Sequence, residues 1–253
     1  MAEEPRILAP RNFVLVHGAF HGGWCWGPVR DRLTALGHRV FTPSLTGLGD
    51  RSHLLGPDIH VETHISDVVN VIEYEDLDDV VLVGHSYGGW VISGVAERVL
   101  PRLASIVFVD AVMPENGDSI LEQAPDATGE VLTRLRAEGR WGHTPPQAEY
   151  FGIQTAENRA WVDSKMSPHP ISHWEDRITL TGAREAVPKK AYVWASEWKH
   201  PVPEGFANKH PVLEGFAKKF EATPGWVRYD VPCGHDVMVD RPERLAGILI
   251  DCA

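Results

Sequence analysis

The chain has 253 residues, of which 43% are hydrophobic and 23% are charged. This balance supports a sizeable core and excludes extended disorder, and the length suits one large domain with an insertion. The formal net charge of -11 argues against nucleic acid or an anionic membrane as a partner. A small neutral substrate remains compatible with it.

The three cysteines, Cys25, Cys233 and Cys252, have neither the spacing of a disulfide framework nor a C-x-x-C pair. The acidic N-terminal stretch lacks the apolar run of a signal peptide, and no segment is apolar for long enough to span a bilayer. We therefore expect a soluble, cytoplasmic protein that uses no metal and no cofactor.

Strands and helices alternate along the first part of the chain. Apolar runs predict strands at 13–18, 38–43, 79–84 and 103–111, and helical patterns are predicted at 29–37, 65–77 and 90–99. This order predicts an α/β fold with a mostly parallel, doubly wound sheet. Residues 1–112 are expected to form the first part of that core.

The pattern breaks after Asp110, where prolines and tryptophans interrupt short amphipathic pieces. We expect residues 113–188 to form a small helical cap inserted over the sheet. The core is expected to resume over 189–253, with strands at 189–196 and 225–236 and a closing helix at 241–252. A repeated decapeptide, PVPEGFANKH at 201–210 and PVLEGFAKKF at 211–220, is interpreted as a local duplication that lengthens one connection.

The segment DVVLVGHSYGGWV places Ser86 between a buried strand and a helix, in the spacing G-x-S-x-G. In such a turn, glycines let strand and helix pack closely, so that the hydroxyl projects above the sheet. The helix N-terminus also favours an anionic intermediate. Ser86 is therefore a candidate nucleophile, and His85 is expected to be a packing neighbour.

A serine nucleophile needs a base, an acid that orients the base, and donors for the oxyanion. His235 follows the last predicted strand, where the order serine, acid, histidine requires the base. The backbone N–H groups of Tyr87 and of Ala19, which lies in the loop after the first strand, are the expected oxyanion donors. The acid has two candidates, Asp110 and Glu197, which both follow predicted strands and keep the chain order.

His60 and His64 have a helical spacing that could bind a metal, but no third ligand is apparent, so a solvated helix face is the expected reading. Several tryptophans lie near the motifs or in the predicted cap. They favour a pocket for a flat aromatic group, and a purely structural core role is the alternative. These tryptophans are Trp24, Trp26, Trp90, Trp141, Trp161 and Trp174.

The segments FVLVHGAFHGGWCW, GHSYGGWV and GHDVMVDRPERLA resemble the α/β-hydrolase superfamily, in the branch of plant methyl esterases, hydroxynitrile lyases and related bacterial esterases. The resemblance implies an eight-stranded sheet, a small cap, Ser86 as nucleophile and His235 as base. Plant members carry their aspartate at the position of Trp198, one residue after Glu197, whereas dehalogenase-like members place it at the position of Asp110. We therefore expect the triad Ser86, His235 and Asp110, with Glu197 as the alternative acid.

The resemblance also bears on the reaction. Hydroxynitrile lyases of this branch carry a threonine and a lysine where this chain has Gly18 and Asp236, and an aspartate would repel departing cyanide. We expect hydrolysis of a small carboxyl or carbamate ester through an acyl-enzyme. The overall pattern resembles bacterial esterases that cleave methyl carbamates of aromatic heterocycles, such as carbendazim. A hydroxynitrile lyase and a noncatalytic small-ligand receptor are the alternatives, and a homodimer is possible for any of them.

Overall fold

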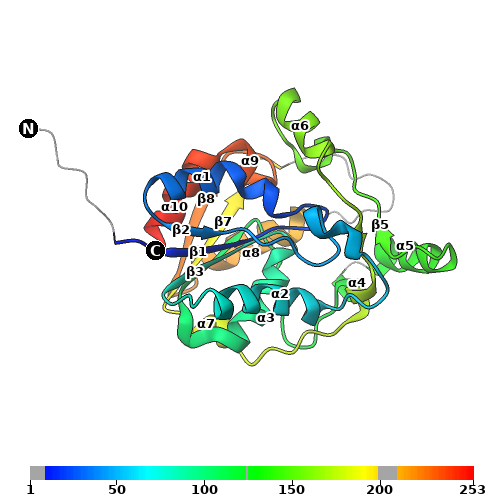
Figure 1. The fold of residues 1–253 in the computed structure, drawn as a ribbon, viewed down its shortest axis with the longest axis horizontal. Helices are drawn as coiled ribbons and strands as arrows, with labels where there is room; N and C mark the ends of the chain where they lie inside the picture. The colour runs from blue at the N-terminus through cyan, green and yellow to red at the C-terminus, as the bar shows by residue number, and fades with distance from the viewer. Residues whose placement is uncertain (1–8, 124, 199–209) are drawn as a thin grey trace, which may run out of the picture.

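A six-stranded sheet, parallel throughout, forms the centre of the computed structural model, which describes residues 9–123, 125–198 and 210–253 (Figure 1). The strand order is β2-β1-β3-β4-β7-β8. The strands are β1 (Asn12–Val16), β2 (Arg39–Phe41), β3 (Val80–His85), β4 (Leu103–Val109), β7 (Lys189–Ala195) and β8 (Trp226–Val231). The predicted α/β class is confirmed, but the sheet in the described ranges has six strands rather than the eight that the resemblance implies.

Helices cover both faces of the sheet (Figure 1). One face carries α1 (Gly27–Ala35), α9 (Val237–Asp240) and α10 (Pro242–Asp251). The other carries α2 (Val61–Tyr74), α3 (Gly88–Val99), α7 (Ala183–Ala186) and α8 (His210–Glu221). Strand β3 shows why two layers are needed: Val80 and Leu82 pack into one apolar cluster while Val81 and Val83 pack into the other.

The strand order reverses direction between β1 and β3. From β1 the chain first adds β2 on one side and then returns to add β3 on the other. In such sheets, ligands bind beyond the carboxyl ends of the strands at the point of reversal. The loop after β1 and the turn after β3 therefore lie where a site is expected.

Most of the segment between β4 and β7, apart from α7, lies beyond this carboxyl end (Figure 1). It contains α4 (Ile120–Gln123), α5 (Pro125–Ala137), α6 (Ala156–Asp163) and a two-stranded antiparallel sheet, β5 (Gly142–His143) with β6 (His169–Pro170). A small apolar cluster of its own includes Leu132, Ile171 and Trp174. The domain boundaries 1–112, 113–188 and 189–253 stay predictions.

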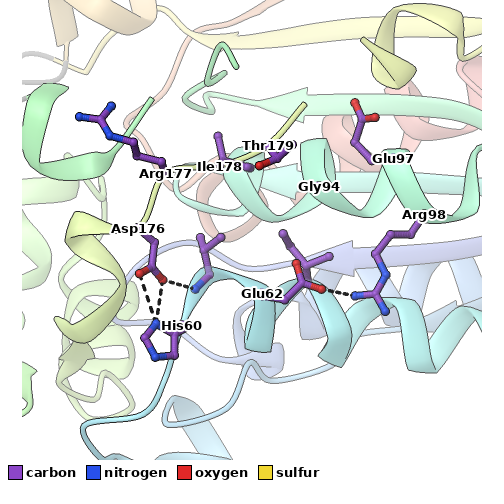
Figure 2. A pocket seen from close by; sticks show the side chains of 11 residues that line it. His60, Glu62, Gly94, Glu97, Arg98, Asp176, Arg177, Ile178 and Thr179 are labelled. Carbon is purple, nitrogen blue, oxygen red and sulfur yellow. Dashed lines mark hydrogen bonds and ion pairs between the residues drawn. The ribbon is translucent and has the colours of Figure 1, made fainter. Parts of the chain in front are cut away.

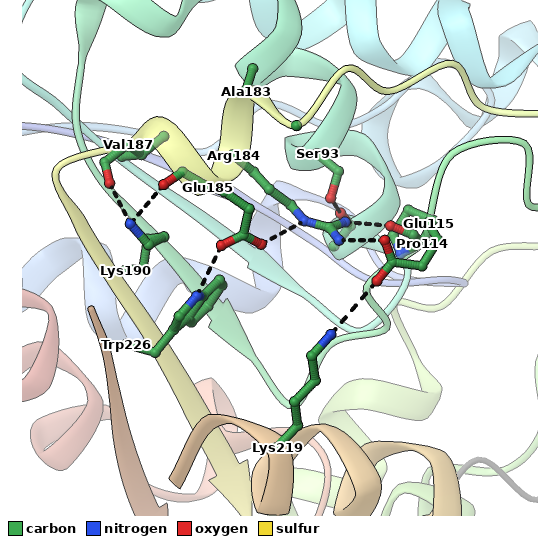
Figure 3. Close-up of polar contacts among 12 residues, drawn as sticks. Ser93, Pro114, Glu115, Ala183, Arg184, Glu185, Val187, Lys190, Lys219 and Trp226 are labelled. Carbon is green, nitrogen blue, oxygen red and sulfur yellow. Dashed lines mark hydrogen bonds and ion pairs between the residues drawn. The ribbon is translucent and has the colours of Figure 1, made fainter. Parts of the chain in front are cut away.

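A buried arginine fastens the two ends of this segment together (Figure 3). The guanidinium of Arg184, on α7, donates to the carbonyl oxygen of Pro114 and lies 3.3 Å from the carboxylate of Glu115. Glu185 pairs with Arg184 and accepts a hydrogen bond from Trp226 Nε1 at 3.1 Å. Because these partners belong to the outgoing chain, the returning chain and β8, the base of the segment is tied to the sheet.

The predicted duplication falls partly outside the described residues. Residues 201–209 of its first copy lie there, whereas the second copy, 211–220, lies within α8. Across the described ranges, every helix is too short or too polar to cross a bilayer.

Candidate active site

Ser86 occupies a strained turn between β3 and α3. Its φ is 53°, in the left-handed region that side chains rarely adopt, and its N–H donates to the carbonyl of Val109 at 3.2 Å. The turn closes because Gly84 and Gly88 lack side chains: a Cβ at Gly84 would lie 2.6 Å from the oxygen of Gly88, and a Cβ at Gly88 would lie 2.8 Å from that of Val16. The predicted elbow geometry is therefore present at Ser86.

His235 and Asp110 meet across the carboxyl end of the sheet. Asp110 follows β4 with a φ of 43°, and its Oδ2 accepts a hydrogen bond from His235 Nδ1 at 2.6 Å. Asp110 Oδ1 accepts from the N–H of Ala195 at 3.2 Å. Both side chains are buried. Since Nδ1 carries the proton in this bond, Nε2 of His235 is left as the ring's acceptor.

Glu197, the alternative acid, is exposed at the surface and does not reach His235. Its N–H donates to the carbonyl of Cys233 at 3.1 Å, which fixes the backbone there. The next residue, Trp198, instead stacks on the His235 ring, with centroids 4.3 Å apart and planes 21° apart. The indole Nε1 donates to the carbonyl of Tyr150 at 2.7 Å. The structure thus brings Asp110, and not Glu197, to the imidazole.

The imidazole of His235 is also held from the side of the elbow. The ring of His85, the residue before Ser86, lies 4.6 Å from the ring of His235. His85 Nε2 donates to the backbone carbonyl of His235 at 3.0 Å, and the N–H of His235 donates to the carbonyl of Phe151 at 2.7 Å. His85 is therefore the packing neighbour that the sequence predicts, and it links the elbow to the loop of His235.

The two predicted oxyanion donors are the amides of Ala19 and Tyr87. Within the described part of the chain, neither N–H donates to a protein acceptor. The loop after β1 comes close to the elbow because Gly18 lacks a side chain: a Cβ there would lie 2.8 Å from Ser86 Cβ. A threonine at this position would clash on this backbone, which removes one of the two features expected of a hydroxynitrile lyase.

His17 was not singled out in the sequence, although it orients this loop. Its Nε2 accepts the N–H of Leu45 at 3.0 Å, so Nδ1 carries the proton and donates to the carbonyl of Gly18 at 2.8 Å. Burial lowers the pKa of His17 to about 3, which keeps the ring neutral. The histidine next to a loop glycine in HGAF was the available signal. Because the Gly18 carbonyl and the Ala19 N–H share one peptide plane, His17 fixes the direction of that N–H.

The surroundings of Asp236 correct the expectation that its charge would repel cyanide. It is fully buried, and its Oδ2 accepts a hydrogen bond from His21 Nε2 at 2.9 Å. Nδ1 of His21 lies 2.7 Å from the carbonyl of Ala19. The aspartate charge is therefore compensated by a histidine, and repulsion of cyanide by Asp236 loses its basis. Sequence reasoning missed this pair because the two residues are 215 positions apart.

The expectation that His60 and His64 lie on a solvated helix face is wrong for His64, whose side chain is fully buried. Its Nε2 donates to the carbonyl of Thr46 at 2.9 Å, so its Nδ1 accepts from the hydroxyl of Tyr87 at 2.8 Å. His60 is exposed and pairs with Asp176. Over the described ranges, no group of three or more His, Cys, Asp or Glu side chains is arranged to bind a metal ion.

The tryptophans singled out in the sequence pack in different surroundings. Trp26 and Trp90 are buried within the two apolar clusters, as the structural alternative predicts. Trp24 contacts Trp161 edge-on at 5.1 Å and stacks on His21 at 5.3 Å. Trp24 is therefore the aromatic side chain of the predicted set that packs directly on the residues around the candidate site.

A cavity of about 380 Å³ lies away from these residues, between α2, α3 and residues 176–179 of the segment between β4 and β7 (Figure 2). His60 and Asp176 pair at 3.1 Å on one side of it, and Arg98 pairs with Glu62 on the other. None of the candidate catalytic residues lines it. Its charged side chains already have ion-pair or hydrogen-bond partners, so we assign no role in the reaction to this cavity.

Residues 13–248 match the model of the alpha/beta hydrolase family. The chain is 43% identical over 244 residues to the carbendazim hydrolyzing esterase of Nocardioides sp. (strain SG-4G), covering 93% of this chain and 96% of that protein. It is 37% identical over 121 residues to methylesterase 2 of Arabidopsis thaliana, covering 47% of this chain and 45% of that protein.

Among solved structures, an extracellular alpha/beta-hydrolase from a Paenibacillus species has the same fold. It aligns with a TM-score of 0.76 at 24% identity, covering 96% of this chain and 99% of that chain. The family match over most of the chain and the identity to a full-length esterase show that the chain belongs to the α/β-hydrolase family, as a hydrolase of the carboxylesterase type.

Proposed function

We propose that the chain cleaves small carboxyl or carbamate esters through Ser86, His235 and Asp110. The observation that carries this proposal is the buried hydrogen bond of 2.6 Å between His235 Nδ1 and Asp110 Oδ2. It leaves Nε2 as the only basic atom of a ring that packs against the elbow residue His85. A base oriented in this way is what a serine hydroxyl needs to become a nucleophile.

The reaction has two steps. His235 Nε2 takes the proton of Ser86 as the hydroxyl oxygen attacks the carbonyl carbon, and the amides of Ala19 and Tyr87 stabilise the oxyanion. Collapse of the tetrahedral intermediate breaks the ester bond, and His235 returns the proton to the leaving alcohol. A water molecule then attacks the acyl or carbamoyl enzyme by the same route and releases Ser86. Asp110 stabilises the charged imidazole in both steps.

The substrate class within this reaction is a methyl carbamate of an aromatic heterocycle, such as carbendazim. The identity of 43% over nearly the whole length of a carbendazim hydrolyzing esterase supports this choice. The proposed triad would be carbamoylated on Ser86, and methanol would leave with the proton from His235. Trp24, which contacts His21 and Trp161 and lies in the segment that follows β1, supplies a flat aromatic side chain close to the proposed oxyanion loop.

A panel assay tests both levels of the proposal. Purified protein is offered a small aryl ester, methyl esters of aromatic acids and carbendazim, and Ser86→Ala and the exposed Ser52→Ala are measured beside the wild type. Turnover is expected to vanish in Ser86→Ala and to persist in Ser52→Ala. A fluorophosphonate probe should label the wild type at Ser86.

Retained turnover or labelling in a folded Ser86→Ala protein would overturn the triad. Hydrolysis of aryl esters without carbendazim turnover would overturn only the substrate. Cyanide release from a cyanohydrin would favour a lyase, and tight ligand binding without turnover or labelling would favour a receptor.

A further inference from the structure

The side chain of His21 lies between two hydrogen-bond acceptors. Nδ1 faces the carbonyl oxygen of Ala19 at 2.7 Å, and Nε2 faces the carboxylate of Asp236 at 2.9 Å. Neither a carbonyl nor an ionised carboxylate can donate, so both ring nitrogens must carry protons. With Asp236 ionised, this geometry places a positively charged His21 beside a negatively charged carboxylate, both buried.

The electrostatics of the pair agree with this assignment. Burial by itself would lower the pKa of His21, but the charge of Asp236 and the hydrogen bonds to Asp236 and Ala19 outweigh burial and raise it. Burial by itself would raise the pKa of Asp236. The charge of His21 and the hydrogen bond that it donates outweigh burial and lower the pKa of Asp236. His85 also faces the pair, with Nε2 3.7 Å from Asp236 Oδ1.

This pair joins the two loops on which the proposed reaction depends. His21 holds the carbonyl of Ala19, while His17 holds the carbonyl of Gly18. The His17 bond thus fixes the peptide plane that contains the Ala19 N–H, and the His21 bond fixes the peptide plane that follows Ala19, so both neighbours of this residue are held. Asp236 directly follows His235, so the same ion pair connects the oxyanion loop to the loop that carries the base.

We propose that His21 is a positioning residue: held on its Nε2 side by Asp236, it restrains the loop that carries the Ala19 N–H through the Nδ1–H bond to the Ala19 carbonyl. The inference rests on the proposed hydrolysis, in which that N–H stabilises the oxyanion. Neither residue touches the reacting atoms. Their contribution is made in the transition state, where negative charge develops on the substrate oxygen, and is absent in the ground state.

The expected size follows from the oxyanion donor. Removing one such donor lowers kcat by about 10²- to 10³-fold. A donor that is present but misdirected retains part of its effect, so loss of the His21 bond to Ala19 should lower kcat by about 10- to 100-fold. KM should change by less than about threefold, because the ground-state carbonyl depends little on this amide.

Two variants separate positioning from support of the fold. In His21→Gln the amide nitrogen can replace Nε2 and keep the bond to Asp236, but the bond to Ala19 is lost. In the double variant His21→Asn with Asp236→Asn, the amide of residue 21 can replace Nδ1 and keep the bond to Ala19, while the buried charges are gone. We expect a 10- to 100-fold lower kcat in the first variant and a kcat within about threefold of wild type in the second.

Equal kcat values in folded His21→Gln and wild type, or an equal loss in both variants, would overturn the proposal. If His21→Gln does not fold, Asp236→Asn provides the second test. There the amide can donate to His21 Nε2, so a neutral His21 keeps its Nδ1 bond to Ala19, and kcat should stay within about threefold of wild type. A loss of tenfold or more in that variant, folded, would overturn the proposal.

Nitrogen-15 NMR of histidine-labelled protein supplies a measurement that does not depend on activity. At pH 7, the wild type should show one histidine with two protonated ring nitrogens that disappears in His21→Gln, and Asp236→Asn should convert it to a singly protonated ring. A singly protonated His21 in the wild type would overturn the ion pair. Absence of ester hydrolysis in the wild type would instead refute the proposed function, whatever the NMR result.

Discussion

Replacing His173 with phenylalanine should make the protein more resistant to acid. His173 is fully buried in the segment between β4 and β7, and among the described residues neither of its ring nitrogens has a hydrogen-bond partner. Its ring packs 5.1 Å from that of Tyr87 and 5.3 Å from that of His64. Burial lowers the pKa of His173 well below its usual value. A phenyl ring fills nearly the same space and has no proton to gain.

The sign follows from proton uptake. The unfolded chain binds a proton at His173 below pH of about 6.5, whereas the folded chain does not. The part of the unfolding free energy that depends on a neutral His173 is therefore fully present above a pH of about 6.5. It is lost as the pH falls toward the folded-state pKa, by about 1.4 kcal/mol per pH unit. At pH 5 the loss from this one histidine is about 2 kcal/mol. Removing an unpaired buried N–H adds a further gain of about 1 to 3 kcal/mol at every pH.

Urea unfolding followed by tryptophan fluorescence at pH 7.5 and pH 5.0 measures both parts. His173→Phe should raise the unfolding free energy at pH 7.5, and its advantage over wild type should grow by about 2 kcal/mol at pH 5.0. The exposed His53→Gln is the control, and its curves should follow the wild type at both pH values. An advantage of His173→Phe that is the same at both pH values, or smaller at pH 5.0, would refute the reasoning.

Two further predictions concern the acid and the packing of the elbow helix. Asp110→Asn should lower kcat on an aryl ester by the order of 10⁴-fold without unfolding the protein, whereas Glu197→Gln should leave kcat within about twofold. The reverse result would make Glu197 the acid. Gly89→Ala should lower the melting temperature by several degrees, because a Cβ at this position would lie 2.1 Å from the carbonyl oxygen of Val112. An unchanged melting curve would show that α3 is free to shift away from that loop.

The strained turn at Ser86 was predictable because its causes are local. A buried strand, two glycines and an amphipathic helix follow one another within a short stretch, and backbone sterics then determine the turn. The alternation of strands and helices predicted the parallel sheet for the same reason. The number of strands was not determined in this way, since the eight came from the resemblance and six are found in the described ranges.

The choice of acid depended on tertiary structure. Asp110 and Glu197 both follow strands, so the sequence left them equal until the resemblance was considered. In the folded chain, β4 ends so that Asp110 accepts a hydrogen bond from His235, whereas β7 is followed by a turn that exposes Glu197 and stacks Trp198 on the imidazole ring. Which carboxylate meets the imidazole is decided by how neighbouring strands end, and that is not encoded in spacing along the chain.

The sequence by itself determined the elements whose causes lie within a few residues: the strands, the helices, the serine turn and the loop glycine at position 18. Only the tertiary structure decided which distant side chains meet, as for His21 with Asp236, which are 215 positions apart. It also decided which histidines are buried. The sequence predicted a solvated helix face for His64, but the side chain is fully buried and burial lowers its pKa. The physical reason is that burial and pairing depend on the surfaces that pack against a residue, and those surfaces come from remote parts of the chain.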